Sequence, residues 1–161
     1  MIHVLGFSPP LFDYWVNKPM LLNTGKYLTL LTPQITEFMS SHFKCKMGAP
    51  LENQGGAGSL GAHWERSVFQ NEIMTASDMT ERLVFSNLTL ALLESTGWYR
   101  VQRTVAEALV WGRGEGCKFV NNLCKGGFPE FCYNPGQMSC TYDGSGIASC
   151  LADSFADSCR Y

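Results

Sequence analysis

The chain has 161 residues, with 12 Lys and Arg against 14 Asp and Glu, which gives a net charge of −2. This length fits one domain, or one domain and part of a second, and excludes a large multidomain machine. Because no basic run occurs, nucleic acid is not an expected partner. No apolar stretch approaches the roughly 20 residues that span a bilayer, and the N-terminus does not have the pattern of a secretory signal.

The first part of the chain predicts little regular structure. Residues 1 to 6 resemble the end of a helix, with Gly6 where a C-terminal cap would stand. Residues 7 to 26 combine prolines and asparagines with large aromatic rings, which is typical of an ordered loop packed by those rings. A short strand is expected at residues 27 to 31.

Two helices and a long loop follow. Thr32 and Pro33 form an N-cap with proline in the first turn, and apolar residues at helical spacing predict a helix of about 11 residues. Residues 48 to 61 are too rich in glycine for regular structure and are expected to form a loop. Ser86 is expected to cap a second helix that stops at Gly97, whereas the apolar segment after it is of uncertain type.

Cysteines gather at the C-terminal end of the chain. Residues 1 to 116 contain one, and the remaining segment contains six: Cys117, Cys124, Cys132, Cys140, Cys150 and Cys159. A structural zinc site is a poorer explanation than disulfides, because the segment has no C-x-x-C pair and no histidine. The total of seven is odd, which implies a free thiol, an intermolecular bond or a partner outside this sequence.

The three histidines are His3, His42 and His63. We interpret His42 as a structural residue, because its helical neighbours suggest no metal partner. His3 begins the pattern H-x-x-G-F, the second half of H-E-x-x-H-x-x-G-F. In a zincin helix, two histidines of such a pattern bind zinc and the glutamate between them acts as general base.

At these motifs the chain resembles the leishmanolysin family of zinc metallopeptidases, which are metzincins with a long insertion before the third zinc ligand. The separation of 60 positions between His3 and His63 fits that insertion. The matching segments are IHVLGFS at 2–8, GAPLENQGGAGSLGAHWER at 48–66, NEIMTA at 71–76, SNLTLALLESTGWY at 86–99, WGRGEGCKFVNNLC at 111–124 and SCTYDGSGIASC at 139–150.

The resemblance implies that His3 is the second zinc ligand, His63 the third, and Met74 the methionine of the Met-turn. The first zinc histidine and the catalytic glutamate would lie upstream of Met1, so this chain by itself is expected to be inactive. Either Met1 is an internal methionine, or the chain is a degenerate copy. We favour the first interpretation because the rest of the site shows no decay. Glu52 could orient His63 or equally brace its loop.

The resemblance also implies the disulfides Cys45–Cys117 and Cys132–Cys150, and it leaves Cys124, Cys140 and Cys159 to pair beyond the end of the chain. We therefore expect an α+β fold, mainly helical and irregular, with residues 1–112 forming the lower half of a metzincin catalytic domain. Residues 113–161 would begin a disulfide-rich domain.

The function that this resemblance implies is zinc-dependent hydrolysis of peptide bonds in proteins. The expected location is extracellular or membrane-associated through the secretory pathway, with protein or peptide substrates as partners. An alternative is a non-catalytic adhesion or binding module on the same fold. A cysteine-rich extracellular scaffold would explain the tail but not the histidine motifs.

Overall fold

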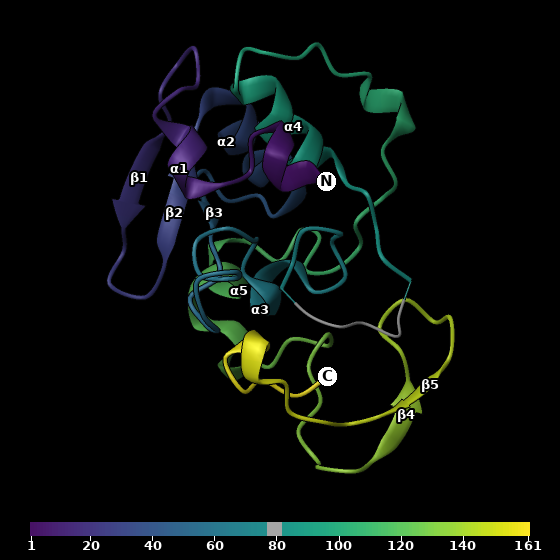
Figure 1. The fold of residues 1–161 in the computed structure, drawn as a ribbon. Helices are drawn as coiled ribbons and strands as arrows, with labels where there is room; N and C mark the ends of the chain where they lie inside the picture. Colours follow the sequence, from purple (N-terminus) through teal and green to yellow (C-terminus); the bar gives the residue numbers. More distant parts are fainter. Residues whose placement is uncertain (77–81) are drawn as a thin grey trace.

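The computed structural model describes residues 1–76 and 82–161 and has a mixed α+β fold (Figure 1). Its elements in chain order are η1 (Ile2–Leu5), α1 (Pro9–Phe12), β1 (Met20–Asn23), β2 (Leu28–Leu31), α2 (Pro33–His42), β3 (Ala49–Pro50), α3 (Arg66–Phe69), α4 (Asn87–Ser95), η2 (Arg103–Val105), α5 (Cys117–Asn122), η3 (Leu123–Lys125), β4 (Met138–Cys140), β5 (Ile147–Ser149) and η4 (Ser154–Ala156).

The N-terminal part contains an antiparallel sheet in the order β1-β2-β3. Strand β2 confirms the strand expected at residues 27 to 31, and Phe7, Phe12 and Trp15 are buried as a ring-packed loop requires. Helix α1 and strand β1 were not expected there. All four residues of β1 are exposed, so no alternation of polar and apolar residues marked it, and its main contacts are with β2.

Helices α2 and α4 pack against each other beside this sheet (Figure 1). Both predicted caps are present, since the hydroxyl of Thr32 accepts from Ile35 N–H and that of Ser86 accepts from Leu88 N–H. The hydroxyls of Thr32 and Ser95 also lie 2.6 Å apart, which joins the start of one helix to the end of the other. The segment of uncertain type after Gly97 has only the short turn η2.

One aromatic core runs through both predicted domains. Phe43 of the N-terminal part stacks on Phe119 of α5, and the ring of Trp111 meets Phe119 and Phe131 edge to face. All four side chains are buried. The segment after residue 112 is therefore packed against the rest of the chain through this shared core.

Three disulfides join the cysteines, with Cα separations of 4.8 Å for Cys45–Cys117, 5.8 Å for Cys132–Cys150 and 5.6 Å for Cys124–Cys159. The first two are the pairs that the family pattern implies. The third corrects the expectation that Cys124 and Cys159 pair beyond the chain: the fold brings them together over 35 positions. Among the described residues Cys140 is the one free cysteine, and it is exposed.

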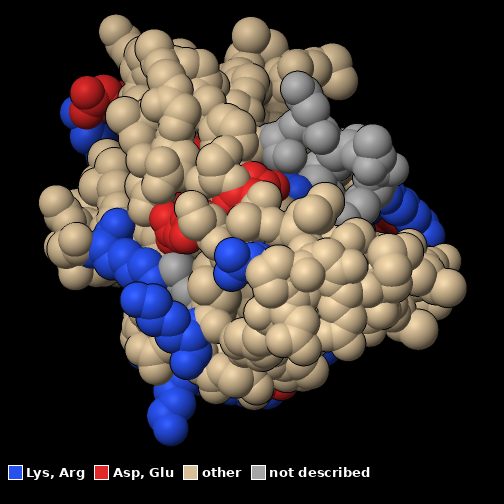
Figure 2. All heavy atoms as spheres, turned by 90° about the horizontal axis from the view of Figure 1, so that it is seen from below, with Lys and Arg blue, Asp and Glu red and all other residues tan. Residues whose placement is uncertain are grey.

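Disulfides of this number are typical of extracellular or secreted proteins. Within the described ranges, no helix is long and apolar enough to cross a membrane. The face seen in Figure 2 carries both signs of charge on a mostly uncharged surface.

Candidate metal site

His3 is presented by the short helical turn η1. The turn ends at Gly6, which has a φ of 142° and lies so close to Thr96 that an added Cβ would be 2.8 Å from its methyl group. Only glycine fits both constraints. The chain then reverses, so that Phe7 returns toward the turn and its carbonyl accepts a hydrogen bond of 2.8 Å from Nδ1 of His3. The H-x-x-G-F motif thus fixes the orientation of its own imidazole.

His63 is held at the end of the glycine-rich loop. Its carbonyl accepts from Glu52 N–H at 2.9 Å, and its Nδ1 lies 3.4 Å from the carbonyl of Ser59. Both contacts come from the segment that precedes it in sequence. The loop expected from the glycines is therefore an ordered support for this histidine.

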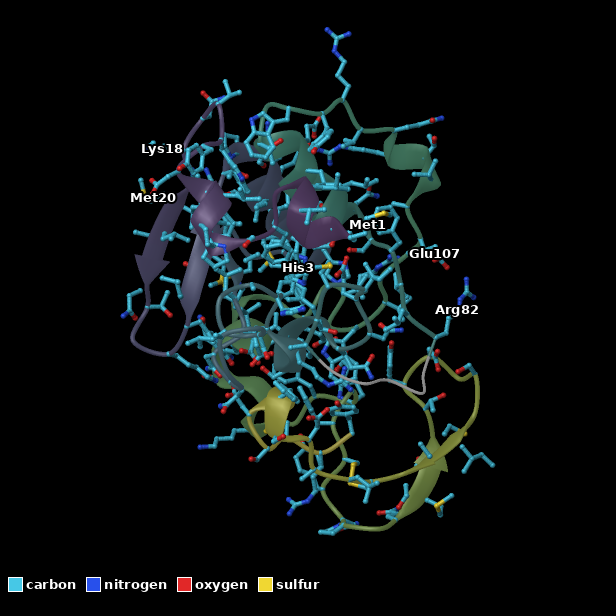
Figure 3. All side chains as sticks on the ribbon, viewed as in Figure 1. Met1, His3, Lys18, Met20, Arg82 and Glu107 are labelled. Carbon is cyan, nitrogen blue, oxygen red and sulfur yellow. A yellow bond between two sulfur atoms is a disulfide. The ribbon has the colours of Figure 1, made fainter. Side chains whose placement is uncertain are left out.

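The fold brings the two imidazoles together. The ring centroids of His3 and His63 are 4.7 Å apart and the rings meet edge to face at 80°. Next to them, the ring centroids of Phe7 and Trp64 are 4.4 Å apart. Phe7 lies on the segment of His3 and Trp64 directly follows His63, so the two segments also contact each other through these aromatic rings. Figure 3 shows His3 below the N-terminal turn, near the middle of the molecule.

Both rings use Nδ1 for their contacts with the backbone. A carbonyl can only accept, so Nδ1 of His3 donates to the Phe7 carbonyl, and Nδ1 of His63 faces the Ser59 carbonyl at 3.4 Å. Burial, with a smaller contribution from the neighbouring His3, lowers the pKa of His63 and favours its neutral form. Within the described ranges, no group of three or more His, Cys, Asp or Glu is placed to hold a metal ion.

Met74 lies on the segment that runs beside His63. Its carbonyl accepts from Trp64 N–H at 2.9 Å, and Thr75 forms a parallel bridge with Trp64. The methionine side chain is buried. The NEIMTA segment is thus attached by its backbone to the residue that directly follows His63.

Glu72 was not singled out by the sequence analysis, although it fixes this segment. Its carboxylate accepts from Met74 N–H at 2.7 Å and from the hydroxyls of Ser86 and Thr89 at 2.9 and 2.6 Å. Thr89 in turn accepts from the Trp64 indole at 3.1 Å. The sequence signal for this role is that Glu72 is the one charged residue of the NEIMTA segment, which contains Met74.

Burial raises the pKa of Glu72 to about 7, against the opposing effect of its hydrogen bonds from Thr89, Met74 and Ser86. A carboxyl group with a higher pKa in the folded than in the unfolded state binds more protons when folded. The contribution of Glu72 to stability is therefore complete below its ordinary pKa of 4.5, and it is lost as the pH rises to about 7.

We expect Glu72→Gln to weaken this pH dependence. In the wild type, titration of Glu72 should lower the free energy of unfolding by up to ~3 kcal/mol as the pH rises from 4.5 to about 7. Urea unfolding at pH 5, 6, 7 and 8 measures the slope, which should be shallower in the variant. Glu37→Gln, at an exposed position on α2, is the control and should keep the wild-type slope. Identical slopes for all three proteins would contradict the prediction.

Glu52 holds the loop that precedes His63. Its carboxylate accepts from Gln54 N–H at 2.8 Å, while Nδ1 of His63 lies 3.4 Å from the carbonyl of Ser59. The carboxylate also has a hydrogen bond to the backbone of Arg66, so Glu52 connects its loop with the start of α3.

Glu52 belongs to a group of buried acids below the loop. Burial raises the pKa of Glu52 to about 7, and burial together with the nearby Glu52 raises that of Glu65 to about 8. Asp157, from the C-terminal segment, adds to both shifts and accepts from the hydroxyl of Tyr27 at 2.8 Å. The carboxylate of Glu65 caps α3 by accepting from Ser67 N–H.

The fold thus places two imidazoles in contact, beside the segment that carries the buried Met74. The model of the leishmanolysin peptidase family matches residues 1–158. The chain therefore belongs to the leishmanolysin family of metallopeptidases.

Individual relatives agree with this assignment. The chain is 38% identical over 137 residues to a leishmanolysin-like peptidase of Drosophila melanogaster, a match that covers 75% of this chain and 20% of the relative. It is 34% identical to a ciliated left-right organizer metallopeptidase of Danio rerio, over 99% of this chain and 28% of the relative. A leishmanolysin-like peptidase of Caenorhabditis briggsae is 46% identical over 70% of this chain and 17% of the relative. The chain thus spans between 17% and 28% of the length of these proteins.

Proposed function

We propose that the protein is a zinc metalloendopeptidase that hydrolyses peptide bonds in proteins, with His3 and His63 as two of its zinc ligands. The observation that carries the proposal is the contact between these imidazoles, 4.7 Å apart at their centroids although 60 positions apart in sequence. Zn²⁺ is commonly bound by histidine, and three protein ligands with one open position are usual in catalytic sites. The remaining ligand and the general base are proposed to come from the longer protein.

When bound, zinc supplies a Lewis acid and lowers the pKa of a coordinated water to about 7. The chain itself positions and supports the ligands. The Phe7 and Ser59 carbonyls orient the imidazoles, and Phe7 with Trp64 form an apolar contact beside them. We further propose that residues 1–112 belong to the lower half of a metzincin catalytic domain, with Met74 in the turn beneath the metal, and that residues 113–161 begin the cysteine-rich domain.

Peptidase activity can be tested with the full-length protein purified from a secreting host. It should cleave denatured casein, lose activity in a metal chelator and regain it when zinc is added. A chelator-treated sample without added zinc is the control for contaminating proteases of other classes. Zinc binding without cleavage of any protein substrate would contradict the enzymatic proposal and favour a binding or adhesion module. Association with a cell surface is a separate proposal that fractionation of the expressing cells would test.

A further inference from the structure

A buried arginine connects the segment after His63 with the C-terminal end of the chain. Arg66 is the first residue of α3, and only 4% of its side chain is exposed. Its Nε donates to the carboxylate of Asp153 at 2.5 Å, and its guanidinium lies 5.5 Å from the ring centre of Tyr161. The Tyr161 hydroxyl donates to the same carboxylate oxygen at 2.6 Å. We call Arg66, Asp153 and Tyr161 the arginine clamp.

The clamp also reaches the turn that leads to Met74. A terminal nitrogen of Arg66 donates to the carbonyl of Gln70 at 3.0 Å, and the hydroxyl of Thr75 donates to the same carbonyl at 2.9 Å. One buried cation therefore touches both the helix that follows His63 and the turn that precedes the methionine.

The turn at Gln70 is strained. Gln70 is fully buried and has φ of 42° and ψ of −90°, a backbone conformation that residues with a side chain rarely adopt. Such conformations persist where the surroundings over-determine them. Here Arg66 contributes to the constraint, since its carbonyl accepts from Gln70 N–H at 2.8 Å and its guanidinium donates to the Gln70 carbonyl, which Thr75 also contacts.

The C-terminal partners of the clamp are themselves fixed. The backbone N–H of Asp153 donates to the carbonyl of Cys159 at 3.1 Å, and Cys159 is bonded to Cys124. Helix η4 begins directly after Asp153 and contacts α3, as the short yellow helix in Figure 1 shows. The cysteine-rich segment thus presents a rigid carboxylate to α3.

From this network we infer that Asp153 is a positioning residue for the metal site, which acts through Arg66 on the segments carrying His63 and Met74. This inference rests on the proposed function. An uncompensated buried guanidinium is unfavourable, so loss of the carboxylate should release the guanidinium from Gln70 and let the strained turn relax. The segment that follows the turn is hydrogen-bonded to the His63 segment, since the Met74 carbonyl accepts from Trp64 N–H at 2.9 Å, so a change in the turn would shift the imidazole of His63.

The test uses the full-length protein with Asp153→Asn, which keeps the shape of the side chain and removes its charge. Zinc affinity is measured by competition with a chromogenic chelator, and the metal geometry by the visible spectrum of the Co²⁺-substituted protein. Substitution of side chains that support the metal ligands commonly weakens metal binding by about 10- to 100-fold. We expect roughly tenfold weaker zinc binding and altered Co²⁺ bands.

Asp143→Asn is the matched control, because Asp143 lies in the same cysteine-rich segment but is exposed and bonds only within its own turn, to Thr141 and Ser145. It should match the wild type in both measurements. Tyr161→Phe, which removes only the hydroxyl donated to Asp153, replaces Asp153→Asn if that variant does not fold, and should weaken zinc binding by a few-fold.

The outcomes separate the inference from the proposed function. A lower melting temperature in Asp153→Asn, with unchanged zinc affinity and an unchanged Co²⁺ spectrum, would show that the clamp only stabilises the fold and would overturn the inference. If the wild type binds neither metal, the proposed function fails and the positioning role fails with it.

Discussion

Replacing His63 by alanine in the full-length protein is expected to lower its zinc affinity by more than about 100-fold and to abolish peptidase activity. Substitution of side chains that only support the ligands weakens metal binding by up to about 100-fold, and removal of a ligand itself should weaken it more. The pair at 4.7 Å would then be reduced to His3 alone in the described part of the site. Chelator competition gives the affinity, and casein cleavage gives the activity.

His42→Gln is the control for losing a buried histidine elsewhere. His42 stacks on Phe38, and its Nε2 donates to the Trp111 carbonyl at 2.8 Å, so these contacts involve neither proposed ligand. The variant should lower the melting temperature and leave zinc affinity unchanged. Equal zinc affinity for His63→Ala and the wild type would refute the assignment of His63 as a ligand.

Removing the Cys45–Cys117 disulfide, by changing both residues to serine, should cost about 4 kcal/mol of unfolding free energy. The bond closes a loop of 72 positions, and loop-closure entropy in the unfolded chain predicts a value of this size. It also joins the segment just after α2 to the start of α5, near the stacked rings of Phe43 and Phe119. Urea unfolding under oxidising conditions measures the loss.

The double serine variant of Cys132 and Cys150 is the matched comparison. That bond spans 18 positions, so the same entropy argument predicts a smaller loss of about 3 kcal/mol. A larger loss for the shorter loop would show that local packing, and not loop closure, sets the ranking.

Local sequence is informative where the deciding contact joins near neighbours along the chain. Thr32 and Ser86 determine helix starts because a cap is a contact between residues two or three positions apart. Strand β1 was missed because its exposed residues form no pattern of their own, and its hydrogen bonds come from β2. The pairing of Cys124 with Cys159 was missed for a similar reason, since a disulfide depends on how the chain returns to itself.

The sequence by itself determined the oxidised character of the tail, the strand and helices with strong local signals, and the motifs that led to His3, His63 and Met74. The tertiary structure decided that the two imidazoles lie in contact, that the Ser59 carbonyl lies against the His63 ring, and that Glu72 and Arg66 hold the adjoining segments. Local signals come from neighbours along the chain. The supporting contacts join segments far apart in sequence, such as Arg66 and Asp153 across 87 positions, and only packing of the whole core brings those groups within hydrogen-bond distance.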